Sequence, residues 1–442
     1  MRISARLAIP LALLVLPLLS WLPLSGPAVQ DSLSATVGRR HGQARLEERD
    51  GLFVLHLEGT PYEMGYQHGA LLRHEIREGL REQIYQRLIL EEGVSHFLLL
   101  RHARSVDRHL PSEYRQEMYG LADGAGISYS DVLLLNSLHD LISQPAPSEE
   151  IRALLLAVHP LFVPPYGLAS ELSSAVTSDD NASIEGIPSL SVETAFVAFG
   201  RATKDGKLLH GFDFSSSQPS PGELLLIIYQ PQEENALVSL AWPGAVGVTM
   251  GLNEEKMSVV ELASPSQDVS LEGVPLPFVL RDVLEYAGDI PTALGLIASA
   301  GRTTGKNVLI GDGKPADAQA MELSAHLYAV FEAEDDIIVR ANHYLDPTLA
   351  ETQTQESFPR NEYESSLARL EAMYEELDGG YGRLDLSGAI NLLGERRPAN
   401  DTGEESVLGI VIASSDLEVW ILSVAGLEEQ VGRWSLKLDE EL

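Results

Sequence analysis

Several residue patterns in the sequence suggest chemistry, but their spacing rejects most of the reactions they suggest. The segment 301–306 is one residue too short for a phosphate-binding loop, and the residue after its lysine is asparagine. His68 and His74 are six positions apart, so a helix would place them on different faces. The chain has no cysteine and no Gly-x-Ser-x-Gly motif, which excludes thiol chemistry and a lipase-type serine nucleophile. The sequence therefore predicts no metal site and no cofactor.

The segment Glu193–Phe214 is the stretch around which the rest of the chain is organised. It predicts a hairpin of two strands joined by a tight turn at Asp205-Gly206, a pair that favours such turns. Successive side chains of a strand point to opposite faces, so Thr194 shares a face with Phe196 and not with Glu193. Before this segment the chain is mostly helical, and after it strands dominate.

Capping and periodicity predict the remaining elements. Thr60, Pro61 and Glu63 form a capping box at the start of a long helix, and Gly65 and Gly69 lie on its apolar stripe. A neighbouring element should therefore approach that helix closely. Further helices are predicted at 94–108, 112–125, 130–141, 276–287, 291–300, from 361 and after 385, and strands at 51–59, 223–230, 236–242, 246–252, 256–262, 307–310, 318–323, 327–331, 337–341, 407–413, 417–424 and 431–438. Because helices flank mostly antiparallel strands without βαβ alternation, the fold class is α+β.

The charge of the chain limits its partners. Its 442 residues carry a net charge of −34, and their hydrophobic fraction of 44% is ordinary for a globular protein. A field of this sign repels phosphate backbones, so no nucleic acid is expected as a partner. It also repels anionic lipid heads, so membrane contact is expected only through an uncleaved N-terminal anchor.

The N-terminus resembles a targeting segment. Arg2 and Arg6 precede an apolar run from residue 7 to residue 24, so residues 1–28 are predicted as a signal peptide or anchor. The expected location is therefore outside the cell membrane: periplasmic, secreted or anchored at its outer face. Beyond it we predict a helical N-terminal segment at 51–142, a linker or processing loop at 143–192, and a core at 193–442.

Taken together, five segments resemble the isopenicillin N acyltransferase-like family, also called the acyl-coenzyme A:6-aminopenicillanic acid acyltransferases. The segments occur in the family's order and span most of the chain beyond the N-terminal run. They are GTPYEMGYQHGALL at 59–72, GLADGAGISYSDVLLLN at 120–136, FVAFGRATKDGKLLHG at 196–211, MGLNEEKMSVV at 250–260 and ANHYLDP at 341–347.

The resemblance implies an N-terminal-nucleophile hydrolase, a four-layer αββα sandwich that here follows the helical N-terminal segment. Family members cut their own chain before a cysteine, whose thiol then attacks an acyl group while its freed amine serves as base. The chemistry is sound because an α-amine with a pKa near neutrality is a base adjacent to the nucleophile. Amide hydrolysis is the natural activity for an exported member, which would lack coenzyme A.

This chain departs from the family pattern at the catalytic position. The family cysteine should lie three residues before Phe196, where this sequence has Glu193. The family often shows an Asn-x-Asp pair after the glycine equivalent to Gly211, and here those positions hold Asp213 and Ser215. Two elements of the catalytic pattern are therefore altered together.

Three interpretations remain open at this point. In the first, the chain is cut before Thr194, which replaces the cysteine as nucleophile, and Asp213 orients or polarises the site. In the second, the protein is a catalytically silent family member that binds an acylated amine or peptide. In the third, it is an unrelated structural or interaction protein of the cell envelope.

The remaining candidate residues would bind the substrate, a small molecule or peptide carrying an acyl amide. Asn253 and Asn342 are candidate oxyanion donors, because a side-chain amide stabilises developing negative charge. His343 and Arg360 are candidate pocket residues, with Arg360 suited to a substrate carboxylate. Each also has a structural explanation, as a turn residue or an exposed residue at a helix start.

Overall fold

The computed structural model describes residues 38–49, 52–91, 94–142, 192–216, 224–355, 357–395, 406–424 and 433–442. The predicted signal or anchor at 1–28 and residues 143–191 of the predicted linker lie outside the described residues. Within the described part, no helix has the length and apolar character needed to cross a bilayer.

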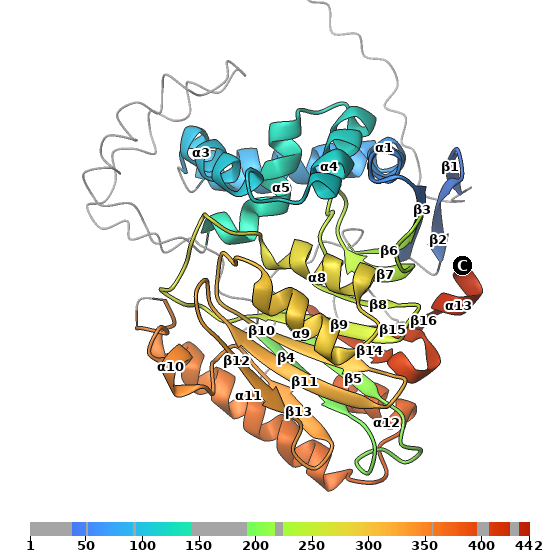
Figure 1. Ribbon diagram of the computed structural model, residues 1–442, viewed down its shortest axis with the longest axis vertical. Helices are drawn as coiled ribbons and strands as arrows, with labels where there is room; N and C mark the ends of the chain where they lie inside the picture. The colour runs from blue at the N-terminus through green and yellow to red at the C-terminus, as the bar shows by residue number, and fades with distance from the viewer. Residues whose placement is uncertain are drawn as a thin grey trace, which may run out of the picture. The chain divides into compact units, whose positions relative to one another are not determined.

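Two β-sheets form the centre of the described chain (Figure 1). Among the described residues, the larger sheet has ten strands in the order β1 (Arg39–His41), β2 (Ala44–Arg49), β3 (Leu52–Gly59), β6 (Leu225–Pro231), β7 (Leu237–Ala241), β8 (Met250–Asn253), β9 (Met257–Ala263), β10 (Lys306–Asp312), β11 (Asp317–Leu323) and β12 (Tyr328–Glu332). The smaller has six described strands in the order β13 (Ile337–Arg340), β4 (Val192–Ala198), β5 (Leu209–Ser216), β14 (Ser406–Ala413), β15 (Glu418–Val424) and β16 (Arg433–Lys437).

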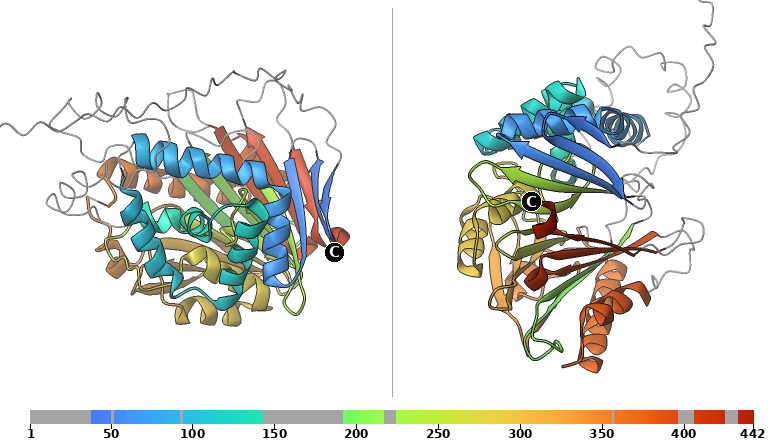
Figure 2. Two further views of the ribbon diagram at one scale, coloured as in Figure 1. Left: turned by 90° about the horizontal axis from the view of Figure 1, so that it is seen from above. Right: turned by 90° about the vertical axis from the view of Figure 1, so that its right-hand side faces the viewer.

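Helices lie along the chain before, between and after the strands. They are α1 (Pro61–Leu71), α2 (Arg73–Gly79), the π-helix η1 (Leu80–Glu91), α3 (His96–Asp107), α4 (Ser112–Ala125), α5 (Tyr129–Ile142), α8 (Leu276–Tyr286), α9 (Ile290–Ser299), α10 (Pro347–Ala350), α11 (Arg360–Gly379), α12 (Leu386–Glu395) and α13 (Leu438–Glu441). The α1–α5 region, α8 and α9 lie on the larger sheet, and α11 and α12 lie on the smaller one (Figure 2).

Alternation along the strands produces three separate apolar cores. On β9, Val259 packs with the helices outside the larger sheet, whereas Val260 points to the smaller sheet. On β4, Val197 lies between the sheets, whereas Phe196 packs under α11 and α12. Cores between helices and sheet, sheet and sheet, and sheet and helices define four layers. The predicted α+β class and αββα sandwich are confirmed.

The contact between α1 and α4 depends on glycines, as the sequence predicts. Thr60 and Glu63 form the expected capping box at the start of α1. A Cβ atom added to Gly65 would lie 1.9 Å from the Glu117 carbonyl oxygen, and one on Gly124 would lie 2.3 Å from the Tyr66 carbonyl oxygen. Since no real Cβ contact is this short, only glycine permits the two backbones to approach so closely.

The segment that precedes the helices α1–α5 contributes a strand, β3, to the larger sheet. Strand β3 lies at the start of the predicted helical N-terminal segment, where the sequence predicts a strand, and it pairs in parallel with β6, with Leu55 opposite Ile227. The helices α1–α5 therefore follow a strand of the larger sheet itself.

The hairpin that the sequence predicts forms in the smaller sheet. Strands β4 and β5 pair antiparallel, with Thr194 opposite Asp213 and Ala198 opposite Leu209. The predicted tight turn at Asp205-Gly206 is wrong, because residues 199–208 form a wider loop that the Gly200 N–H closes by donating to the Gly206 carbonyl.

Buried histidines make the fold sensitive to acid. Burial lowers the pKa of His56 to about 4 and the pKa values of His68 and His210 to about 3. His68 Nε2 accepts the Gly244 N–H at 2.9 Å, a bond that only an unprotonated nitrogen can accept. These rings are therefore neutral in the fold at neutral pH.

We expect the melting temperature to fall as the pH is lowered from 7 to 4.5. The unfolded chain takes up protons at its histidines near pH 6.5, whereas the folded rings resist until about pH 3 to 4, so acid favours unfolding. Burial raises the pKa of Glu117 and Glu261 to about 7 and that of Asp282 to about 6, which acts in the opposite sense, so the expectation requires the contribution of the histidines to exceed that of these carboxyls. Calorimetry across this range tests the expectation, and a melting temperature that rises in acid contradicts it. His68→Gln, which keeps an acceptor for Gly244, should reduce the pH dependence.

Candidate functional site

The side chain of Glu193 points into the space between the two sheets. On β4 it shares a face with Ala195 and Val197, which belong to the core between the sheets. Its Oε2 atom accepts a hydrogen bond from the Ala263 N–H at 2.6 Å and another from the Asn342 side-chain amide at 3.1 Å. A backbone donor and an amide donor thus converge on one carboxylate oxygen, and Glu193 is 8% exposed.

Asn342 is held in place from several directions. Its Nδ2 also donates to the Ala263 carbonyl at 2.9 Å, and its Oδ1 accepts the Glu193 N–H at 3.1 Å. Arg369 of α11 donates from Nη2 to the same Oδ1 at 2.6 Å. Because the guanidinium can only donate, this contact orients the amide so that its N–H groups face Glu193 and Ala263. Nothing in the sequence marks Arg369, since its role depends on the packing of α11 against β13 and β4.

A second buried charged cluster lies on the other side of the larger sheet. Lys306 on β10 donates to Glu261 on β9 at 2.9 Å, and Asp140 of α5 accepts hydrogen bonds from Thr303 and Thr304. Burial raises the pKa of Glu261 to about 7. Although burial opposes it, the carboxylates of Glu261, Asp140 and Glu193 raise the pKa of Lys306. The lysine therefore stays cationic and helps to balance the negative charge of Glu193.

Thr194 and Asp213 face the opposite side of the smaller sheet. Thr194 shares its face with Phe196 and Ala198, which pack toward α11 and α12. It is 1% exposed, and its hydroxyl has no hydrogen-bond partner among the described residues. The register places Asp213 directly across from it on β5. The structure brings this pair together, but the thickness of the smaller sheet separates it from the Glu193–Asn342 contact.

Asn253 and His343 are both buried in polar contacts of their own. Asn253 donates to the carbonyls of Leu284 at 2.8 Å and Ala287 at 2.9 Å, and accepts the Met257 N–H at 2.8 Å. These bonds hold the end of α8 against β8, on the outer side of the larger sheet. His343 contacts Ser366 through Nδ1 at 2.8 Å, and burial lowers its pKa to about 4, so its ring is neutral.

Arg360 lies on the surface and not in the site. Its side chain is 78% exposed and forms an ion pair with Glu364 at 2.7 Å, one turn along α11. Of the predicted substrate-binding residues, the structure therefore places Asn342 against Glu193 and His343 next to it in the chain. It places Asn253 and Arg360 elsewhere.

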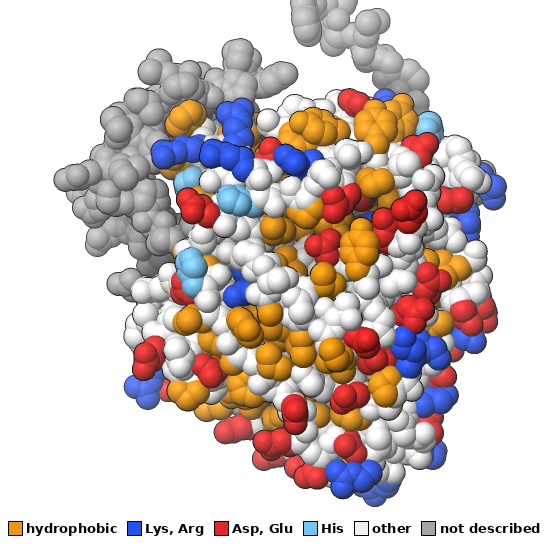
Figure 3. All heavy atoms as spheres, in the orientation of Figure 1, with side chains coloured by type: hydrophobic (Ala, Val, Ile, Leu, Met, Phe, Trp, Pro, Cys, Tyr) orange, Lys and Arg blue, Asp and Glu red, His pale blue; other side chains and the backbone are white. Residues whose placement is uncertain are grey.

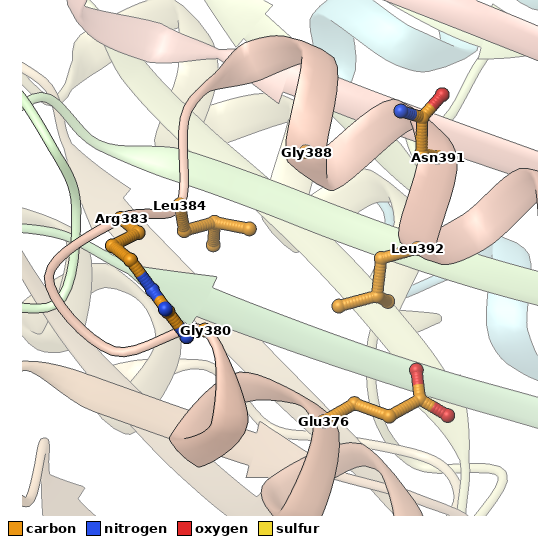
Figure 4. A pocket seen from close by; sticks show the side chains of 7 residues that line it. All are labelled: Glu376, Gly380, Arg383, Leu384, Gly388, Asn391 and Leu392. Carbon is orange, nitrogen blue, oxygen red and sulfur yellow. The ribbon is translucent and has the colours of Figure 1, made fainter.

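A surface hollow lies away from all these residues. A cavity of about 560 Å³ lies between the end of α11 and α12, and the side chains that line it are drawn in Figure 4. It is lined by Glu376, Gly380, Arg383, Leu384, Gly388, Asn391 and Leu392. None of the residues predicted from the sequence lines it.

Comparison with known families tests the family resemblance that the sequence predicts. Residues 201–405 match the family model described as "Acyl-coenzyme A:6-aminopenicillanic acid acyl-transferase". The predicted family resemblance is confirmed.

Two curated relatives match the chain over longer stretches than the family model does. An uncharacterised protein of Archaeoglobus fulgidus is 28% identical over 415 residues, which cover 84% of this chain and 64% of the relative. Protein dcd1B of Dictyostelium discoideum is 24% identical over 315 residues, covering 65% of this chain and 53% of the relative. The chain thus spans less than two thirds of the length of either relative.

Solved structures show more distant likeness. Penicillin V acylase from Agrobacterium tumefaciens is 12% identical with a TM-score of 0.39, covering 56% of this chain and 86% of that one. An N-acylethanolamine-hydrolyzing acid amidase ortholog from Caenorhabditis elegans is 15% identical with a TM-score of 0.37, covering 50% and 93%. These likenesses are too distant to carry an argument.

Proposed function

We propose that the intact chain binds acyl amides without hydrolysing them, because Glu193 occupies the donors that hydrolysis would need. The observation that carries the proposal is the convergence of the Ala263 N–H and the Asn342 amide on Glu193 Oε2. Amide hydrolysis develops negative charge on the carbonyl oxygen, and such a pair of donors is what stabilises it. With a carboxylate already bound to both donors, a substrate oxygen cannot take that place.

The identity of residue 193 also removes the family's nucleophile. A carboxylate held by a backbone N–H and a neutral amide is a weak nucleophile, and no thiol exists anywhere in the chain. The substrate class is an acylated amine or peptide, by the family match. The location is outside the cell membrane, supported by the basic and apolar residues at 2–24.

Mass spectrometry and calorimetry of the purified protein test this proposal. We expect one polypeptide mass, unbroken between residues 193 and 194, and saturable binding of N-phenoxyacetyl or N-palmitoyl amides with no release of free amine. Release of amine at a rate proportional to protein concentration overturns it. If neither the N-phenoxyacetyl nor the N-palmitoyl amides bind, the binding role is overturned as well.

Thr194 supports a second candidate function, an active amidohydrolase formed by self-cutting. The observation that favours it is the buried, unpartnered hydroxyl directly across from Asp213. Water would hydrolyse the peptide bond between residues 193 and 194, freeing the Thr194 amine. That amine would take the hydroxyl proton while the oxygen attacks the acyl carbon and the amine leaving group departs with a proton.

A pair of substitutions separates the two candidates. If Thr194 is the nucleophile, we expect wild-type protein and Thr194→Ser to be cut before residue 194 and Thr194→Val to stay intact. Thr194→Val keeps the shape of the side chain and removes a hydroxyl that has no hydrogen-bond partner among the described residues, so it should fold like the wild type. Finding wild-type chains uncut after prolonged incubation eliminates the second candidate.

A further inference from the structure

Helix α3 presents a row of arginines to solvent. Arg101, Arg104 and Arg108 are exposed and follow one another at spacings of three and four residues, which places them on one face of a helix. The opposite face, formed by Leu99, Ala103 and Val106, is buried in the core of the helical layer, where α3 packs against α5. We call Arg101, Arg104 and Arg108 the arginine face. The inward face is fully used for packing, so the arginines are not required to hold α3.

The arginine face is unusual in so acidic a chain. Some other exposed arginines pair with acids, as Arg201 does with Asp336 at 3.0 Å and Arg360 with Glu364 at 2.7 Å. Others, Arg73, Arg77 and Arg383, donate to backbone carbonyls. Within the described ranges, none of the three arginines of the face forms an ion pair. Figure 3 shows basic side chains gathered over α3, whereas acidic ones predominate farther down the same view. Surplus positive charge is therefore concentrated at one place on a chain of net charge −34.

Exposed aromatic side chains lie beside the arginine face. Tyr119 of α4 is 51% exposed and stacks on Tyr129 of α5 with ring centroids 4.1 Å apart. Tyr129 donates its hydroxyl to Asp107 at the end of α3, which ties the ring pair to the helix that carries the arginines. Phe97 of α3 is 50% exposed and lies in line with the arginine row. Cations next to amphipathic rings are typical of surfaces that contact lipid headgroups.

We propose that the arginine face binds the phosphate headgroups of an anionic lipid surface. The three guanidiniums lie along about 10 Å of a straight helix and project to one side, so they can reach separate headgroups of a flat layer. The net negative charge does not forbid this contact. At physiological salt the screening length is about 8 Å, so acidic groups on distant faces are screened while the arginines act at contact distance. Because the apolar face of α3 is buried in the protein, the helix lies on the lipid surface and does not insert.

A vesicle-binding experiment on the full chain tests the proposal. Wild-type protein is sedimented with vesicles of phosphatidylcholine alone and with vesicles containing 30% phosphatidylglycerol, at 0.15 M NaCl. We expect the wild type to partition more strongly to the anionic vesicles. In Arg101→Gln/Arg104→Gln/Arg108→Gln, we expect the ratio of the partition coefficients for anionic and neutral vesicles to fall by about 100-fold. Insertion of the N-terminal apolar run, which follows Arg2 and Arg6, is common to the wild type and the triple variant, so the comparison between these two proteins isolates the arginine face.

The matched control removes the same charge elsewhere. Arg201→Gln/Arg360→Gln/Arg383→Gln changes the net charge by the same amount at exposed arginines on other elements, and should keep the preference for anionic vesicles. Equal partitioning of wild-type protein to both vesicle types overturns the proposal, as does an equal loss in the control. If polyglutamate displaces the protein from the vesicles at a lower concentration of charge than phosphatidylglycerol micelles do, the arginine face binds an acidic protein. That result overturns the lipid partner. Circular dichroism confirms that the variants are folded.

Discussion

Replacing Arg281 with methionine is expected to lower the free energy of unfolding by about 3–5 kcal/mol, among the largest effects of any single substitution in this fold. Arg281 of α8 is fully buried. It forms an ion pair with Glu285 at 2.6 Å, lies 3.6 Å from the carboxylate of Glu117 on α4, and donates to the Val246 carbonyl at 3.1 Å. Methionine has similar volume, so the loss comes from leaving buried carboxylates without their cation and not from a cavity.

The size of this effect should depend on pH in a defined direction. Burial raises the pKa of Glu117 to about 7 even though Arg281 opposes the shift. Without Arg281 the pKa rises further, so the folded variant holds a proton that the unfolded chain releases near pH 4.5. A carboxyl with a raised pKa in the folded state lowers stability as the pH increases between those two values. The variant should therefore lose more stability at pH 8 than at pH 5.

Urea unfolding at pH 5 and pH 8 measures both quantities. Adding Glu117→Gln to the variant should recover part of the loss, because it removes the carboxylate that lacks a partner. Arg360→Met is the control, since that exposed arginine should contribute less than about 1 kcal/mol. A loss below 1 kcal/mol, or a loss that is larger at pH 5, would show that the guanidinium does not neutralise Glu117.

The layered fold was predictable from local patterns, because they are set by neighbours close in the chain. The capping box at Thr60 and Glu63 and the paired strands around residues 193–214 follow from short-range sequence rules, and the structure shows both. Element ends were less predictable. Helix α11 begins at Arg360 after Pro359, one residue before the predicted start at residue 361, because proline imposes the extended entry by itself.

The candidate site was only partly predictable, because its groups come from distant parts of the chain. Asn342 was predicted as an oxyanion donor because it carries a side-chain amide, and it does contact Glu193, 149 residues away. The Ala263 N–H has no sequence signature at all, since every residue other than proline carries one. Arg369 and Lys306 become neighbours of the site only through packing between layers. Conversely, Asn253 looked equivalent to Asn342 in sequence, yet its amide holds the end of α8.

Removing the side chain of Glu193 is expected to expose the donors that it occupies. In Glu193→Ala, the Ala263 N–H loses its 2.6 Å contact and remains buried without an acceptor, and the Asn342 amide loses one of its acceptors. An unsatisfied buried donor costs about 1–3 kcal/mol, so we expect a loss of about 2 kcal/mol in the free energy of unfolding. Glu193→Gln keeps an oxygen at the same position and should lose less, which separates hydrogen bonding from charge.

The same variant should regain stability when a small carboxylate is supplied. Acetate fits the space left by the removed side chain and presents the oxygen that both donors lack. At about ten times its dissociation constant, a ligand that binds only the folded state stabilises it by about 1.4 kcal/mol. We therefore expect 0.1 M sodium acetate to raise the melting temperature of Glu193→Ala more than 0.1 M sodium chloride does, with no such difference for the wild type or Glu193→Gln. If acetate has no specific effect, the Ala263 and Asn342 donors do not form an anion site, and the explanation for a blocked hydrolase fails with them. If acetate binds, the Ala263 N–H and the Asn342 amide together hold an anion that is not covalently attached to the chain. Stabilising a tetrahedral oxyanion requires the same property.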